Sequence, residues 1–206
     1  MKNLLLLVLT ISFTFLSIQN TEAQSRKKKS KSGFQIENLF GGGNLAFAKP
    51  IGDFNQYAKG GFSYNIVVGY KLTEKLGVGI EYGSALTAAI DTAASGLFGV
   101  NLYGLNSYLA KGWYRFTEGK IRPYAAIGLG LARVQEPDLT IGTETVLGAK
   151  RSGFGANAEL GVNILGVNLS YSFNLSGRSP EEPVINGAAD LAVNYHRFAI
   201  GYIVNF

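Results

Sequence analysis

The sequence predicts an all-β protein, an eight-stranded antiparallel up-and-down β-barrel, and two patterns carry that prediction. The first is alternation, because apolar or aromatic side chains occupy every second position in one segment after another, and only a strand places such a set on one face. The second is a regular change between short and long connections. The 206 residues, with 47% hydrophobic and 16% charged side chains, are enough for one such domain.

Eight segments show the alternation. The clearest runs from Phe62 to Leu72, where large apolar side chains alternate with small or polar ones such as Ser63 and Asn65. Four more segments are as regular, at 76–83, 154–164, 167–175 and 198–206, and three weaker ones lie at 37–48, 97–116 and 121–134. Helical periodicity fits none of them, so we expect eight strands.

The connections predict how the strands are arranged. Short turns are expected at 73–75, 117–120 and 165–166, and long connections at 49–60, 87–96, 135–151 and 176–190. In an up-and-down sheet this order places every long loop at one end and every turn at the other, with both termini at the turn end. Short periplasmic turns and longer external loops are typical of outer-membrane barrels.

Alternation alone does not distinguish a membrane barrel from a soluble, lipocalin-like barrel with an apolar interior. The polar set consists largely of Gly, Ser and Asn with a few charges, which is too weakly charged for a soluble surface but suits the side-chain-filled lumen of an eight-stranded barrel. The apolar set carries aromatic residues near strand ends, namely Tyr70, Tyr114 and Phe116 beside turns and Tyr82 and Phe154 nearer loops. Aromatic girdles of this kind mark lipid interfaces, so we predict a transmembrane barrel.

The first 36 residues precede the barrel domain, which we place at 37–206. Residues 1–23 predict a cleaved signal peptide, with Lys2 near the start, an apolar run too short to span a bilayer, and small residues up to Ala23. The segment 24–36 is a basic periplasmic tail, read as a solvated linker in preference to a phosphate- or lipopolysaccharide-binding segment. Residues 33–206 contain 13 basic and 13 acidic side chains, so no nucleic-acid partner is expected. The predicted location is the bacterial outer membrane.

The composition excludes several kinds of site. The chain has no cysteine and one histidine, which excludes disulfides, thiolate ligands and a multi-histidine zinc site, and we expect no metal or cofactor. His196 is followed by Arg197 and Phe198 and has no suitably spaced serine, so no catalytic pair is evident. We expect His196 to be a structural residue at the lipid interface and the protein not to be an enzyme.

Seven charged residues share the parity of the polar face. Charges in a narrow interior must be paired or hydrated. We therefore predict a lumen network of ion pairs and hydrogen bonds that fills the barrel, with a selective path for small ions or solutes as the alternative, since wide channels need many more strands. The residues are Lys71, Glu81, Lys111, Arg115, Arg122, Glu159 and Arg197.

The final segment, Arg197 to Phe206, has apolar residues at every second position from Phe198 to Phe206, all expected on the outer face. It resembles the C-terminal signal, here Tyr202 and Phe206, by which outer-membrane barrels are recognised, and this resemblance implies the barrel-assembly machinery as a partner. The segments 49–54 and 121–124, each followed by closely spaced glycines, resemble the recurrent segments of the small outer-membrane protein β-barrel domain family, a relative of OmpA/OmpX-type barrels. The resemblance covers essentially the whole mature chain, and it implies a fold but no ligand, because that family includes adhesion, stress-related and small-solute members.

The function expected from the sequence is that of a non-enzymatic, monomeric outer-membrane barrel, acting as an envelope scaffold or in surface interactions through its loops. Its expected partners are outer-membrane lipids and lipopolysaccharide, and no surface ligand is named. The alternative is a porin-like protein for the passage of small solutes or apolar molecules. A third hypothesis is an outer-membrane lipid hydrolase, because some small barrels of similar size are lipid A deacylases with a His-Ser-acid set.

Overall fold

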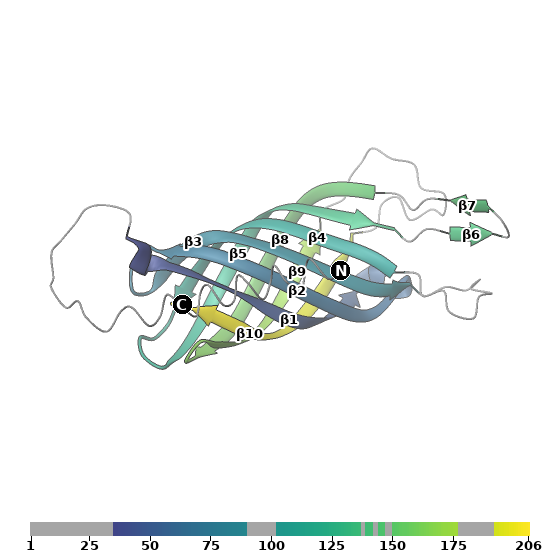
Figure 1. Ribbon diagram of the computed structural model, residues 1–206. Coiled ribbons are helices and arrows are strands. Elements are labelled where there is room, and N and C mark those ends of the chain that lie inside the picture. Colours follow the sequence, from purple (N-terminus) through teal and green to yellow (C-terminus); the bar gives the residue numbers. More distant parts are fainter. Residues whose placement is uncertain (1–34, 90–101, 137–138, 142–143, 147–149, 177–191) are drawn as a thin grey trace, which may run out of the picture. The chain divides into compact units, whose positions relative to one another are not determined.

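The structure is a computed structural model that describes residues 35–89, 102–136, 139–141, 144–146, 150–176 and 192–206. The unit Glu37–Phe206 contains a closed barrel of eight strands (Figure 1). These are β1 (Leu39–Ile51), β2 (Ala58–Lys71), β3 (Leu76–Ala89), β4 (Leu102–Arg115), β5 (Ile121–Gln135), β8 (Lys150–Ile164), β9 (Val167–Ser176) and β10 (Asn194–Val204). The predicted signal peptide and residues 24–34 of the predicted tail lie outside the described residues.

The strand order around the barrel is β1-β10-β9-β8-β5-β4-β3-β2, and every neighbouring pair is antiparallel. The first and last strands close the sheet, in a register that runs from Gly41 opposite Val204 to Ile51 opposite Asn194. Figure 1 shows β10, in yellow, beside β1, in dark blue. Closure leaves the barrel no unpaired edge. The predicted eight-stranded up-and-down barrel is confirmed.

The turn end has the short hairpins expected of it. Between β8 and β9 only Leu165 and Gly166 intervene, and both have positive φ, 54° and 96°. Two residues in this conformation form the hairpin turn whose twist matches that of the flanking strands. The turn is further held by the Gly166 backbone N–H, which donates to Asn163 Oδ1 at 3.1 Å.

At the loop end several expected boundaries differ from the structure. β8 begins at Lys150 and β10 at Asn194, each four residues before its predicted segment. Residues 90–101 and 177–190, which belong to the expected loops 87–96 and 176–190 and to the expected strand 97–116, lie outside the described residues. The first connection is only 52–57, not 49–60, and contains the 3₁₀-helix η3 (Gly52–Gln56). β3 continues to Ala89, six residues beyond the predicted segment 76–83. The expected loop 135–151 contains a hairpin, β6 (Leu139–Ile141) and β7 (Glu144–Val146), which Figure 1 shows beyond the loop ends of β5 and β8. Backbone pairing continues past the membrane band, where a strict apolar alternation is no longer required. A short 3₁₀-helix, η2 (Ile36–Asn38), precedes β1.

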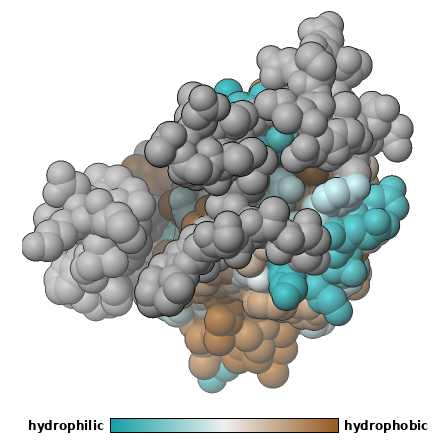
Figure 2. All heavy atoms as spheres, turned by 90° about the vertical axis from the view of Figure 1, so that its right-hand side faces the viewer, coloured by the Kyte–Doolittle hydropathy of each residue, from teal (hydrophilic) through white to brown (hydrophobic). Residues whose placement is uncertain are grey.

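The large apolar side chains are on the outside. Ile80, Ile127 and Leu131 are 66%, 67% and 64% exposed. Val67, which lies between the exposed Ile66 and Val68 in β2 and faces the lumen, is 2% exposed. In Figure 2, which faces the loop end, hydrophobic residues in brown cover the lower flank and hydrophilic residues in teal gather at the rim. An apolar outer face around a polar lumen is the arrangement of a membrane barrel and not of a soluble one.

A polar rim bounds this apolar face on the loop side. In six strands an outward aromatic or leucine residue is followed, two positions nearer the loops, by an outward polar residue. The pairs are Phe47 and Lys49, Tyr82 and Ser84, Tyr108 and Asn106, Leu131 and Arg133, Phe154 and Ser152, and Phe198 and His196. We call the six polar residues the loop-side rim.

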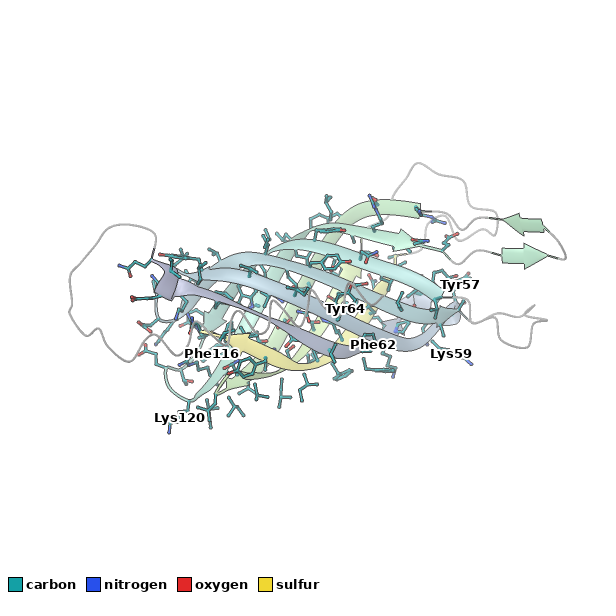
Figure 3. The ribbon with its side chains drawn as sticks, viewed as in Figure 1. Tyr57, Lys59, Phe62, Tyr64, Phe116 and Lys120 are labelled. Atoms are coloured by element: carbon teal, nitrogen blue, oxygen red, sulfur yellow. The ribbon has the colours of Figure 1, made fainter. Side chains whose placement is uncertain are left out.

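The apolar band below the rim has the height of a membrane. On β8 it extends from Phe154 to Ile164, which matches the roughly 9–11 residues that a membrane-crossing strand needs. At the other end Phe116 and Lys120 lie by the turns, and Figure 3 shows them opposite Tyr57 and Lys59 at the loop end. Within the described residues, no helix is both long and apolar enough to cross a membrane.

Candidate functional site

Four charged side chains from four strands meet inside the lumen. Lys111 Nζ of β4 lies 2.6 Å from Glu81 Oε2 of β3 and 2.7 Å from Glu159 Oε2 of β8. Arg197 Nη2 of β10 lies 2.8 Å from Glu81 Oε1 and 3.3 Å from Glu159 Oε2. Each carboxylate therefore has two cationic partners, and each cation has two carboxylates. We call these four residues the lumen tetrad.

Burial and charge balance decide what the lumen tetrad does. Its side chains are between 0% and 4% exposed. A buried ion without a partner is unfavourable by several kcal/mol, so a neutral set of two acids and two bases is the arrangement that such a site requires. Because β3 and β10 lie three steps apart in the strand order, the ion pairs cross the lumen as well as linking adjacent strands. The tetrad thus occupies the interior and ties its walls together.

Neutral side chains add hydrogen bonds to the tetrad, although Arg197 Nη1 has no hydrogen-bond partner among the described residues. The Tyr124 hydroxyl donates to Glu159 Oε1 at 2.6 Å, and Arg197 Nε donates to Ser172 Oγ at 3.1 Å. Tyr124 and Ser172 were not among the residues expected in the lumen network. Strand parity could have indicated that both side chains face the lumen. Tyr124 lies two positions after Arg122, and Ser172 is next to the outward Tyr171.

Amides fill a further part of the lumen. Asn44 Nδ2 donates to Asn65 Oδ1 at 3.2 Å, and Asn168 Nδ2 donates to Asn44 Oδ1 at 3.0 Å. All three side chains are buried, and they connect β1, β2 and β9. Paired amides can occupy a narrow interior without the penalty of an unpaired polar group. The small polar residues of the inner face therefore form part of the filling.

Aromatic side chains close the turn end of the lumen. The Phe40 ring packs edge-on against Trp113 and Phe206, with centroids 5.2 and 5.4 Å apart, and Phe206 packs against Tyr124 at 4.8 Å. The Arg115 guanidinium lies 5.4 Å from the Phe206 ring centroid, and Arg115 Nη2 donates to the Thr73 carbonyl at 3.3 Å. We call Phe40, Trp113, Tyr124 and Phe206 the turn-end plug.

The predicted outward orientation of Phe206 is wrong. β10 ends at Val204, Asn205 adopts a left-handed φ of 56°, and Phe206 turns into the lumen, where it is 2% exposed. Val204, also expected outside, is 9% exposed, whereas Tyr202 is 46% exposed on the outer face as expected. Arg122 Nη1 donates to the Phe206 carbonyl and holds the end of the chain at the mouth. The alternation of exposed and buried residues stops after Tyr202, two residues before β10 ends, since Ile203 and Val204 are both buried.

The seven residues of the predicted lumen network fall into two groups. Glu81, Lys111, Glu159 and Arg197 form the tetrad. Arg115 and Arg122 lie at the turn end, where they bond to backbone carbonyls and hold Phe206. Lys71 is half-buried at the last position of β2, also at the turn end. The structure therefore brings four of the seven together inside the lumen, buries Arg115 beside Phe206, and leaves Lys71 and Arg122 half-buried at the turn end.

The loop end of the lumen is closed by Phe54, which was not among the predicted site residues. The 3₁₀-helix η3 carries Phe54 into the barrel, where it is 2% exposed and packs edge-on against Tyr103 with ring centroids 5.3 Å apart. Gly52, with φ of 61°, lets the chain reverse direction just before it. Phe54 packs in a cluster with Leu105 and Tyr195. A nearby cavity of about 20 Å³ has room for one water.

His196 lies on the outer face of β10, in the loop-side rim. Its Nδ1 is 2.7 Å from the Tyr171 hydroxyl oxygen, and the two rings are stacked with centroids 5.3 Å apart. Directly across the β1·β10 pair stands Lys49. The structure thus places the single histidine on the outer face, as its parity predicts.

Comparison with known proteins supports the fold. No protein-family model matches the chain, and no curated protein matches it either. Among solved structures it is similar to Neisserial surface protein A (NspA), with 18% identity, a TM-score of 0.58, and coverage of 82% of this chain and 97% of that one. The attachment invasion locus protein Ail of Yersinia pestis gives 13% identity, 82% and 99% coverage, and a TM-score of 0.49. The N-terminal β-barrel domain of Pseudomonas aeruginosa OprF gives 15% identity, coverage of 81% of this chain and 97% of that one, and a TM-score of 0.42. With the strand topology, the likeness to NspA shows that this chain has the fold of the eight-stranded outer-membrane barrels.

Proposed function

We propose that this chain is a non-enzymatic, monomeric barrel of the bacterial outer membrane, which serves as an envelope scaffold or carries surface interactions through its external loops. The observation that carries the proposal is the filled lumen. The lumen tetrad occupies the interior, and an aromatic residue closes each mouth, Phe206 at the turn end and Phe54 at the loop end. An eight-stranded barrel packed in this way has no open aqueous path.

The proposal includes a route to the membrane. The signal peptide 1–23 directs export and is removed after Ala23, and the basic tail 24–36 remains in the periplasm. The barrel-assembly machinery recognises the C-terminal strand through Tyr202 and Phe206. After insertion the apolar band contacts lipid chains and the loop-side rim contacts headgroups, including lipopolysaccharide. The balanced charge of residues 33–206 supports the absence of a nucleic-acid partner.

Electrical conductance tests the filled lumen. Mature protein, residues 24–206, is refolded and added to a planar lipid bilayer, with a sixteen-stranded porin as the positive control for detection. Insertion is verified separately by the change in gel mobility between heated and unheated samples. We expect no steady conductance above the bilayer baseline. Stable single-channel steps that depend on Glu159 would contradict the proposal and favour the passage of small solutes.

Cell fractionation tests the location. The intact chain, expressed in a bacterium with an outer membrane, should appear in the outer-membrane fraction with Gln24 as its first residue by mass spectrometry. A full-length chain with an intact N-terminus, or recovery in the inner-membrane fraction, would be incompatible with the proposed route.

A further inference from the structure

Lys49 and His196 carry neighbouring nitrogen groups on the outer face and have no acidic partner among the described residues. They stand directly opposite each other in the β1·β10 pair, a position in which Cβ atoms are about 4.5–5.5 Å apart. Lys49 is exposed and His196 half-buried. Among the residues that the structure describes, Lys49 Nζ has no ion pair or hydrogen bond, and Asp53, four positions along the chain, is not within 4.0 Å of it. Basic groups directly opposite each other are stabilised when an anion lies between them.

Tyr171 fixes the imidazole ring. Its hydroxyl engages Nδ1 at 2.7 Å, and its ring stacks on the imidazole at an interplanar angle of 26°. The Phe173 ring also contacts the imidazole, with centroids 5.5 Å apart. With Nδ1 engaged, Nε2 is the imidazole nitrogen that has no hydrogen bond within the described ranges. A ring held in one orientation loses little entropy when it binds a ligand.

An apolar surface lies directly below this pair. Phe47 and Phe198 oppose each other two positions nearer the turns, and each is 53% exposed. The Phe198 ring also packs against Tyr171, with centroids 5.0 Å apart. Hydrogen-bond donors above an exposed aromatic pair, at the edge of the apolar band, match a molecule with an anionic head and hydrocarbon chains.

We propose that Lys49, His196 and Tyr171 form a binding site for the phosphate group of a lipid in the external leaflet. The Lys49 ammonium and the His196 imidazole donate to phosphate oxygens, while Phe47 and Phe198 contact the first part of the acyl chains. The site rests on the proposed orientation in the outer membrane, which puts the loop end outside. It gives His196 a binding role beyond the structural one expected from the sequence.

The single histidine makes this site directly observable. Mature protein labelled with ¹⁵N-histidine is refolded in uncharged maltoside micelles, where its imidazole contributes one set of signals. Lipid A that carries its phosphates is titrated in, and the dephosphorylated lipid is the matched probe. We expect a saturable shift of the His196 signals with the phosphorylated lipid only. Lys49→Gln should weaken the apparent affinity about tenfold, because a charge-assisted bond is lost.

Control variants separate the site from general cationic attraction. Lys120→Gln removes an exposed lysine at the opposite, turn end of the barrel and should leave the affinity unchanged (Figure 3). Phe198→Ala should weaken lipid binding if the aromatic pair contacts the chains. An equal loss of affinity in Lys49→Gln and Lys120→Gln would overturn the assignment.

The remaining outcomes distinguish the site from the proposed function. Inorganic phosphate at the same concentration is expected to leave the His196 signals in place; if it reproduces the full shift, the site takes a free anion and the lipid assignment fails. If the barrel inserts into vesicles with normal heat-modifiable mobility but phosphorylated lipid has no effect, the site fails and the proposed location stands. Failure to insert into any lipid vesicle would contradict the proposed function itself.

Discussion

Glu81 and Arg197 are 116 positions apart in the sequence, and their side chains meet at 2.8 Å inside the lumen. Arg197 belongs to β10, the last strand, which closes the barrel against β1. The lumen tetrad is therefore complete only once the last strand is in place. Closure of the sheet and neutralisation of the buried charges depend on each other. We therefore expect the stability of the barrel to be sensitive to substitutions in the tetrad.

Glu159→Gln should lower the free energy of unfolding. It leaves Lys111 and Arg197 with one carboxylate between them. We expect a loss on the order of 3–5 kcal/mol for a dry site and less where water enters, measured by urea unfolding in lipid vesicles. Glu118→Gln, in the exposed turn before β5, is the control and should stay within about 0.5 kcal/mol of the parent. Equal stability of the two variants would contradict a buried, paired Glu159.

The loss of unfolding free energy caused by an arginine on the outer face should depend on the depth of that position in the membrane. Ile200 is 58% exposed within the apolar band, and Ile200→Arg should cost about 2–4 kcal/mol in vesicle-refolded protein. Ser152 belongs to the loop-side rim, and Ser152→Arg should cost roughly 0–1 kcal/mol. Similar penalties at both positions would show that the band and the rim have been placed incorrectly.

Substitutions of Phe206 and Tyr202 should differ in their effect on the unfolding free energy of the purified protein. In cells, both should reduce the amount of barrel in the outer membrane. Phe206 is buried in the turn-end plug, so Phe206→Ala should cost about 3–5 kcal/mol of unfolding free energy in purified, refolded protein. Tyr202→Ala, on the outer face, should cost less. In cells either change should reduce the amount of barrel in the outer membrane if both residues belong to the assembly signal. Normal outer-membrane levels of both variants would remove the assembly role and leave only the structural one.

Two glycines on adjacent strands offer a matched test of close packing. A Cβ at Gly130 of β5 would lie 2.0 Å from the Tyr108 carbonyl oxygen, whereas a Cβ at Gly112 of β4 would have no atom within 4 Å. Gly130→Ala should therefore destabilise by about 1–3 kcal/mol, since backbone must move to admit the methyl group. Gly112→Ala should be neutral or slightly stabilising. The reverse order in urea unfolding would contradict the close approach of β4 and β5 at Gly130.

Alternation made most of the fold predictable. Lipid on one face and a crowded polar lumen on the other force a strict period of two, and the segment from Phe62 to Leu72 shows it plainly. Outside the band that requirement ends, so the extension of β3 to Ala89 and the β6–β7 hairpin left little trace in the pattern. The inward turn of Phe54 depends on η3, which period two does not describe.

The sequence predicted which residues face the lumen better than it predicted which of them form ion pairs with each other. Parity identified Glu81 and Arg197 as inward-facing, but the choice of partners depends on strand tilt and register, which bring non-adjacent strands together. Trp113 shares the parity of Lys111 and Arg115 and could have been included on that basis. Phe206 faces the lumen because β10 has ended at Val204 and Asn205 has a left-handed backbone conformation. The alternation of the strand therefore no longer determines the direction of the Phe206 side chain.

The inward end of the chain also determines where the protein can be modified. Asn205 directs the backbone into the lumen and Arg122 holds the Phe206 carbonyl, so any peptide fused after Phe206 would begin inside the turn-end mouth. An affinity tag there would extend from a residue whose ring is packed in the turn-end plug and would disturb the contact between Arg122 and the Phe206 carbonyl. A tag placed ahead of Glu37, before the first residue of the barrel unit, leaves that ring where it is.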